Sequence, residues 1–178
     1  MGVPKQPKKA LLFIAVLFSD PAVYTQTCAM LEDQFGPIIM ESPAMCWDYS
    51  EYYDKEMGNQ LMRRFIFFSR LIDEGMLARI KIATNKIENR MAVAEKRRIN
   101  LDPGYITHAK VVLASTKDYA HRIYIGEGIY AEITLMYIKK QLQKGPFTYR
   151  DYVDKRTLRV LTIARKLFSD VLLFQSAA

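Results

Sequence analysis

An uninterrupted apolar run, residues 10–18, lies near the start of the chain and has charged or polar residues on both sides. A short run of this kind is typical of a strand that is covered on both faces of a sheet. Ser19-Asp20-Pro21 follows it, where Asp20 can cap a helix and Pro21 suits the first helical position. The predicted helix ends at Gly36-Pro37. The chain therefore opens with a buried strand followed by a helix.

The same run is neither an export signal nor a membrane span. Lys5, Lys8 and Lys9 precede it as in a secretory signal, but no small-residue cleavage site follows. It is also far shorter than the ~20 residues that a membrane helix needs. Cys28 and Cys46 are too few for a disulfide scaffold and lack zinc-site spacing. We therefore expect a cytoplasmic protein with no membrane partner.

The length and the net charge of the chain limit its domain organisation and its possible partners. The 178 residues suit a single globular domain, residues 1–178, and half of them are hydrophobic, which excludes a disordered chain. Lys and Arg number 26 against 19 Asp and Glu, a net charge of +7. A positive excess favours acidic partners such as phosphorylated metabolites or nucleic acid, but it does not specify a function.

The rest of the chain alternates between strand and helix patterns. In its first half we expect an extended segment over 37–47, a helical turn over 49–58, a strand over 61–71 and a helix over 73–95. A strand over 98–102 and a turn at 103–104 follow, and residues 107–113 suit a short helix and a strand equally well. The last elements are a hairpin of 122–125 with 129–139 and a terminal helix over 155–174. The pattern predicts an α+β fold with a ferredoxin-like βαββαβ core and a largely antiparallel sheet. A β-hairpin and a C-terminal amphipathic helix extend this core.

Three segments resemble known functional motifs, but the residues around them do not fit the corresponding sites. Residues 126–131 match the G-x-G-x-x-A form of the dinucleotide fingerprint, but a strand follows them where the fingerprint needs a helix. Thr116-Lys117-Asp118 resembles a guanine-reading motif, yet no phosphate-binding loop accompanies it. His108 and His121 lack the Ser or Thr of two-histidine phosphoesterases. No motif identifies a cofactor, and no spacing predicts a metal site.

Strand parity instead gathers polar residues on one face of the sheet. Successive strand residues point to opposite faces, so alternate positions of the strand over 98–102 and of the two hairpin strands share a side. The face collects Arg98, Asn100, Asp102, Arg122, Tyr124, Tyr130, Glu132 and Thr134. An antiparallel sheet ordinarily leaves one face wet, and cross-strand pairs such as Arg122 with Glu132 are common there. Arginine and tyrosine in place of lysine favour a ligand site over a merely solvated face.

The leading hypothesis is a site for a small anionic ligand, a nucleotide or another phosphorylated metabolite. We expect Arg98, Lys117 and Arg122 to hold the anion, with Asn100 and Thr134 as further ligand contacts. Asp102, Glu132 and His121 are the candidate catalytic residues, as acid, base or hydroxyl ligands. Tyr124 and Tyr130 would pack on a ring. The sequence does not decide between binding and catalysis.

Several stretches together carry a family resemblance. They are Arg98 to Tyr105, Ala109-Lys110, Thr116 to Tyr124, Gly128 to Leu135, the opening strand, Phe35-Gly36-Pro37, Asp48-Tyr49 with Tyr52-Tyr53, and Glu56-Met57-Gly58. In these residues the chain resembles the domain of unknown function 4416 family of prokaryotic proteins, over nearly its whole length. That family has no established activity, cofactor or catalytic residue to carry over. The resemblance implies a single-domain bacterial or archaeal cytoplasmic protein.

Two alternative functions are compatible with the same sequence. A non-enzymatic RNA-binding module could stack bases on Tyr124 and Tyr130 and contact phosphates through Arg79, Lys86 and Arg90. A homo-oligomeric interaction scaffold would use the terminal helix, which is apolar around much of its circumference. The extra apolar positions are Val160, Ile163, Leu167 and Leu172, and they predict a homodimer.

Overall fold

The apolar run at the start of the chain is strand β1 (Leu11–Phe18), and all of its residues are buried. In the computed structural model, which describes residues 2–7 and 9–177, β1 lies between β4 (Met62–Phe68) and β5 (Ile99–Ile106). The described residues form one antiparallel sheet of nine strands in the order β2-β4-β1-β5-β6-β8-β7, with β3 paired to β4 and β9 to β8. The α+β prediction with an antiparallel sheet is confirmed.

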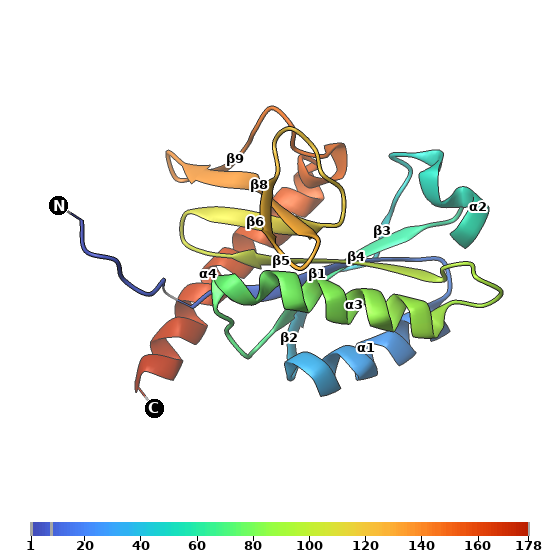
Figure 1. Cartoon of the computed structure of the whole chain (residues 1–178), viewed down its shortest axis with the longest axis horizontal. Coiled ribbons are helices and arrows are strands. Elements are labelled where there is room, and N and C mark those ends of the chain that lie inside the picture. Colours follow the sequence, from blue (N-terminus) through green and yellow to red (C-terminus); the bar gives the residue numbers. More distant parts are fainter. Residues whose placement is uncertain (1, 8, 178) are drawn as a thin grey trace.

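The other strands extend this central trio on both sides. They are β2 (Ile38–Glu41), β3 (Met45–Cys46), β6 (Lys110–Ser115), β7 (Ile123–Gly126), β8 (Ile129–Ile138) and β9 (Gln141–Lys144). β2 and β3 follow one another along β4, whereas β6 to β9 continue the sheet beyond β5. Figure 1 shows β6, β8 and β9 to the left of the arm that β3 and α2 form.

Helices cover both faces of the sheet (Figure 1). α1 (Pro21–Phe35) and α3 (Leu77–Met91) pack on one face, and α4 (Lys155–Ala177) packs on the other. α1 begins where the Asp20 carboxylate accepts a hydrogen bond from the N–H of Ala22 at 2.8 Å, and it ends at Gly36 with a φ of 93°. Both ends of this helix confirm the prediction.

Short helical segments precede the longer elements. η1 (Glu51–Tyr53) leads into α2 (Asp54–Met57), η2 (Glu74–Met76) leads into α3, and η3 (Arg150–Tyr152) precedes α4. Within the described part of the chain, no helix combines the length and the apolar character needed to cross a membrane.

Two apolar cores lie on opposite faces of β1. Leu12, Ile14 and Val16 pack beneath α1 and α3, whereas Leu11 and Phe13 pack beneath α4. α4 contributes Leu161, Ala164 and Phe168 to the second core, and all three are buried. Of the extra apolar positions on this helix, Val160 and Leu172 pack beside that core and Ile163 is exposed. The homodimer stays a prediction.

Local turn signals misled the sequence interpretation in the middle of the chain. Pro103-Gly104 does not end a strand, because β5 continues through both residues to Ile106. Of the helix and the strand that suit residues 107–113 equally, the helix is wrong and the strand is present, since Lys110–Ser115 is β6. Gly104 is needed for packing: a Cβ atom there would lie 2.4 Å from the Val112 carbonyl oxygen and 2.6 Å from the Phe13 ring.

Two further boundaries differ from the prediction. The helix expected to reach residue 95 ends at Met91, and Ala94 and Glu95 adopt positive φ angles beyond it. The predicted hairpin is present as β7 and β8, but a bulge in β8 moves Leu135 to the α4 side of the sheet. Strand β9 was not predicted. It follows a turn in which Lys139 and Lys140 both have positive φ, a conformation usually signalled by Gly or Asn.

Candidate functional site

A cavity of about 590 Å³ lies where β5 and β6 separate. β5 pairs with β1 along its whole length, but its register with β6 covers only Gly104 to Ile106. The backbone of Leu101 faces away from β1, and Pro103 lies two residues further along the same edge. Because proline has no N–H to donate, it cannot continue the ladder toward β6. The unpaired half of β5 therefore forms one wall of the cavity.

Two side chains of α3 replace the missing strand at this edge. The Lys81 ammonium donates to the Leu101 carbonyl at 2.8 Å, and the Glu88 carboxyl accepts from the Leu101 N–H at 2.5 Å. Lys81 and Glu88 are seven residues apart and hence lie on one helix face, with Asn85 between them. All three line the cavity. The backbone N–H and carbonyl of Leu101 are thereby satisfied while the space beside them stays open.

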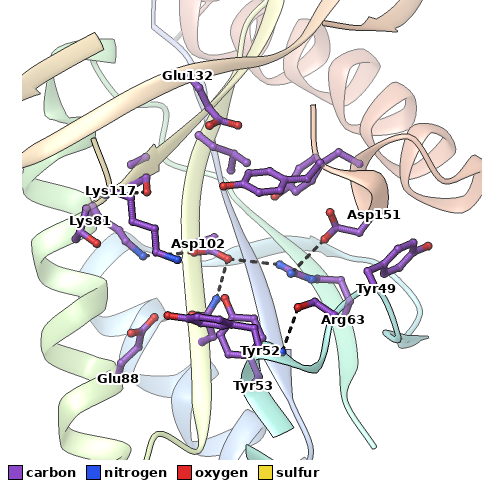
Figure 2. Close-up of a pocket in the computed structure, with 18 of the residues that line it drawn as sticks. Tyr49, Tyr52, Tyr53, Arg63, Lys81, Glu88, Asp102, Lys117, Glu132 and Asp151 are labelled. Carbon is purple, nitrogen blue, oxygen red and sulfur yellow. Dashed lines mark hydrogen bonds and ion pairs between the residues drawn. The ribbon is translucent and has the colours of Figure 1, made fainter. Parts of the chain in front are cut away.

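A network of charges forms the floor of the cavity (Figure 2). Asp102 accepts a hydrogen bond from the Asn100 amide at 2.7 Å and lies 3.4 Å from the Lys81 ammonium and 3.8 Å from Arg63. The other carboxylate beside Arg63 is Asp151, at 3.3 Å, which also accepts from the Trp47 indole N–H at 3.1 Å. These contacts fix the position of each floor carboxylate.

Arg63 is the most deeply buried cation of the floor. Burial by itself would lower the pKa of its guanidinium, but Asp151, Tyr152 and Asp102 hold that pKa above the usual value. Among the described residues, its Nε and Nη1 atoms and the Tyr152 hydroxyl are buried without a hydrogen-bond partner. Each such atom costs about 1–3 kcal/mol. A ligand atom that accepted a hydrogen bond here would recover part of that cost.

Aromatic side chains line the opposite wall. Trp47 packs with Leu17, Met57 and Leu61 and makes edge contacts with the rings of Tyr49 and Tyr53. The remaining aromatic residue of this wall is Tyr52, which contacts the Tyr53 ring and is largely exposed. Across the cavity, the Lys117 ammonium lies 4.6 Å from the centre of the Tyr52 ring. Aromatic surface and positive charge therefore face each other.

The roof is held by a buried ion pair. Arg122 donates to Glu132 at 2.8 Å, and both side chains are almost completely buried. Its other N–H groups donate to the Ser115 hydroxyl, the Lys117 carbonyl and the Tyr149 hydroxyl. Four of its donors are thus engaged within the protein, so Arg122 positions the segment that carries Lys117 and has little capacity left for an anion.

The carboxyl group of Glu88 has a pKa well above the usual value for glutamate. Burial raises the pKa of its carboxyl to about 7, although Lys81 and the Leu101 N–H act in the opposite direction. A carboxyl group with this pKa exchanges its proton near neutral pH, which is the range used in general acid and base chemistry and in proton-coupled binding.

The cavity collects only some of the residues predicted from strand parity. Asn100, Asp102, Lys117, Arg122 and Glu132 line it. His121 and Thr134 lie behind Glu132: the His121 ring nitrogen is 3.0 Å from the Glu132 carboxylate, and the Thr134 hydroxyl donates to it at 3.5 Å.

Besides His121 and Thr134, three further predicted residues lie outside the cavity lining. Arg98 precedes β5 and forms an ion pair of 2.7 Å with Asp20, at the start of α1. Tyr124 and Tyr130 face each other across the β7–β8 hairpin, with ring centres 5.3 Å apart. Tyr130 lies two positions before Glu132 along β8, which is about 7 Å at the usual rise per residue. The tyrosine pair therefore lies beyond the end of the site.

Sequence reasoning missed most of the surrounding wall. Arg63 and Glu88 are not among the residues that the sequence predicts for the site. The aromatic residues near Tyr52 and the segment Arg150–Tyr152 gave no site signal at all. Within the described residues, no three His, Cys, Asp or Glu side chains are grouped as they would be to hold a metal ion.

The comparisons with known proteins identify a family. Residues 8–168 match the family described as Domain of unknown function (DUF4416). The chain belongs to this family. Every residue that lines the cavity lies inside the matched region of the DUF4416 domain. The search of curated proteins and the search of solved structures found no significant match.

Proposed function

We propose that the cavity of this DUF4416 protein binds a small anionic ligand, a nucleotide or another phosphorylated metabolite. The observation that carries the proposal is the combination of an aromatic wall with positive charge in excess of negative charge. Of the described lining residues, six are basic and four are acidic. The volume of about 590 Å³ falls within the range of about 300–1,000 Å³ that is usual for small-molecule sites.

Lys117 and Arg150 are the residues best suited to hold the anion. The other basic residues of the cavity have carboxylate partners: Arg63 with Asp151, Lys81 with Asp102, Arg97 with Glu56, and Arg122 with Glu132. Within the described part of the chain, Lys117 and Arg150 form no ion pair. Because both are exposed at the rim, a phosphate group could reach them without being fully dehydrated.

The remaining parts of the ligand would meet the wall and the floor. A planar ring can pack against Tyr52 and Tyr53, which carry the exposed edge of the aromatic cluster. Asp102 and Asn100 present oxygen and amide groups that can pair with sugar hydroxyls. Arg98, Tyr124 and Tyr130 have no part in this arrangement.

A second proposal concerns the fold of the part of the sheet around β1. We propose that β1, α1, β2, β4, α3 and β5 form a ferredoxin-like unit. The order β2-β4-β1-β5 within an antiparallel sheet and the alternation of strands and helices support this assignment. The strands after β5 would then be an addition whose divergence from the core creates the cavity.

A thermal-shift screen tests the ligand class. The probes are inorganic phosphate, ribose 5-phosphate and the ribonucleoside 5′-phosphates, each with and without Mg²⁺. A ligand at 100 times its Kd stabilises the protein by about 2.7 kcal/mol, which corresponds to a rise in Tm of about 5–10 °C for a chain of this size. Lys117→Gln should reduce the shift, because it removes the rim charge without disturbing any ion pair.

Lys86→Gln is the matched control, since Lys86 is exposed on α3 outside the cavity. Arg98→Gln and Tyr124→Ala provide a second control from the residues outside the site. The proposal fails if no phosphorylated compound raises Tm, or if Lys117→Gln and Lys86→Gln behave alike. If RNA bound instead, in a strongly salt-dependent manner abolished by Tyr124→Ala, the site would lie on the hairpin and the cavity proposal would be wrong.

A further inference from the structure

Glu88 has a place in the cavity that the anion site does not explain. It lies among the floor and wall residues, whereas Lys117 and Arg150 stand at the rim. We propose that Glu88 recognises the heterocycle of a nucleotide by accepting a hydrogen bond from a base N–H group, and that this contact requires the carboxyl group to give up its proton. This inference rests on the proposed function and names the class of phosphorylated ligand.

The geometry leaves one carboxyl oxygen available for the base. Oε1 of Glu88 accepts the Leu101 N–H, which anchors the carboxyl group against β5. Among the described residues, Oε2 has no hydrogen-bond partner. Figure 2 shows Glu88 extending from α3 toward Tyr52 and Tyr53. A base packed against those rings would therefore present its edge to Glu88.

Glu88, Asn100, Asp102 and Lys117 all line the same cavity, so one nucleotide can contact the α3 wall, the floor and the rim. The base would lie beside Glu88, the sugar beside Asn100 and Asp102, and the phosphate at Lys117. Asn85 and Asn89, on the same face of α3 as Glu88, also line the cavity. Their amide groups can both donate and accept, so they can pair with whichever polar atoms of the base edge Glu88 does not use.

The charges around Glu88 leave it responsive to a ligand. Lys81 on α3 and Arg97 before β5 favour the ionised carboxylate, whereas Asp102 on β5 disfavours it. Tyr53 faces it from η1, and burial raises the pKa of both Tyr53 and Glu88. With the pKa of Glu88 at about 7, the two protonation states are nearly equally populated at neutral pH. The N–H group of a base can donate a hydrogen bond to Oε2 only when Oε2 does not carry a proton directed at the base.

The proton balance of binding follows directly. The O–H bond of the protonated carboxyl breaks, the proton passes to the buffer, and the freed oxygen accepts the N–H of the base. If only the ionised form binds, the competent fraction rises from about one tenth at pH 6 to about nine tenths at pH 8. Nucleotide affinity should therefore be about tenfold higher at pH 8 than at pH 6.

Calorimetric titration of the full chain with AMP, GMP, CMP and UMP at pH 6, 7 and 8 tests the inference. Ribose 5-phosphate corrects for ionisation of the phosphate group. We expect at least one nucleotide to bind about tenfold more tightly at pH 8 than at pH 6 after that correction. At pH 7, titrations in two buffers of different ionisation enthalpy should detect about half a proton released per nucleotide. In Glu88→Gln the corrected change should fall below about twofold, because glutamine cannot ionise.

A second measurement does not depend on a variant. Carbon-detected NMR of the side-chain carboxyl groups should show one Glu that titrates near pH 7 in the free protein and at lower pH with bound nucleotide. The inference is overturned if nucleotide binding is weakened by Lys117→Gln yet has no corrected pH dependence, or keeps that dependence in Glu88→Gln. If no nucleotide binds and Lys117→Gln has no effect, the proposed function itself has failed, and this inference fails with it.

Discussion

Replacing Arg122 by methionine should destabilise the protein strongly, because the substitution isolates a buried carboxylate. The Arg122 side chain is 1% exposed and that of Glu132 is 4% exposed, with Nε 2.8 Å from the carboxylate oxygen. Removing one partner of a buried ion pair costs about 3–5 kcal/mol. For a chain of this length, that loss corresponds to a fall in Tm of about 6–20 °C.

The loss has two structural sources that a variant series can separate. Arg122→Met leaves the Glu132 carboxylate with contacts to the His121 ring and the Thr134 hydroxyl, and it unpairs the groups that Arg122 holds near Ser115 and Lys117. Adding Glu132→Leu removes the isolated carboxylate while leaving those groups unpaired. The double variant should therefore recover part of the stability, with a coupling energy of about 1–3 kcal/mol.

Urea unfolding followed by circular dichroism measures these differences. The matched control is Arg79→Met, because Arg79 pairs with Glu127 at 3.4 Å on the surface, where its side chain is 79% exposed. Its removal should change stability by less than about 0.5 kcal/mol. If Arg122→Met cost no more than Arg79→Met, or if Glu132→Leu gave no recovery, Arg122 would not be the structural clamp that its contacts indicate.

Two further predictions concern packing and protonation. Gly104→Ala should cost about 1–3 kcal/mol in urea unfolding, because the added methyl group would clash with the Val112 carbonyl oxygen; Gly75→Ala, where the methyl group meets nothing within 4 Å, is the control and should cost much less. Glu88→Gln tests the raised pKa of about 7 through stability: the native state binds the extra proton between about pH 4.5 and 7, so wild-type stability falls across that window as pH rises. Relative to the variant, the wild type should lose about 3 kcal/mol between pH 4.5 and pH 8, and equal pH profiles would contradict the assignment.

The elements that the sequence predicted well are those whose signals are local. β1 is recognisable because its uninterrupted apolar run fits a strand buried on both faces. α1 is recognisable because Asp20 and Gly36 satisfy backbone groups at its two ends. The hairpin of β7 and β8 follows from alternating residues around a glycine pair. In each example the deciding interactions connect residues close together in the chain.

The cavity depended on contacts that no local pattern encodes. Glu88 and Lys81 contact β5 because α3 passes the part of β5 that is not paired with β6. Arg63 is buried because Asp151, far away in sequence, is brought beside it. Strand parity placed Asn100 and Asp102 on the correct face, since it depends only on alternation. It could not predict which hairpin residues reach the cavity, because that depends on where β5 and β6 separate.

Pro103 connects the main error of the sequence interpretation with the presence of the site. A Pro-Gly pair ordinarily marks a turn, and the pair here was interpreted in that way. Instead the strand continues, and the missing N–H falls on the edge that faces β6. Pairing therefore begins at Gly104, where a hydrogen side chain allows β6 to approach closely, and it stops short of Leu101. Pro103 ends the hydrogen-bond ladder between β5 and β6, and Gly104 allows the two strands to pair. This dipeptide therefore determines where the two strands separate and where the cavity opens.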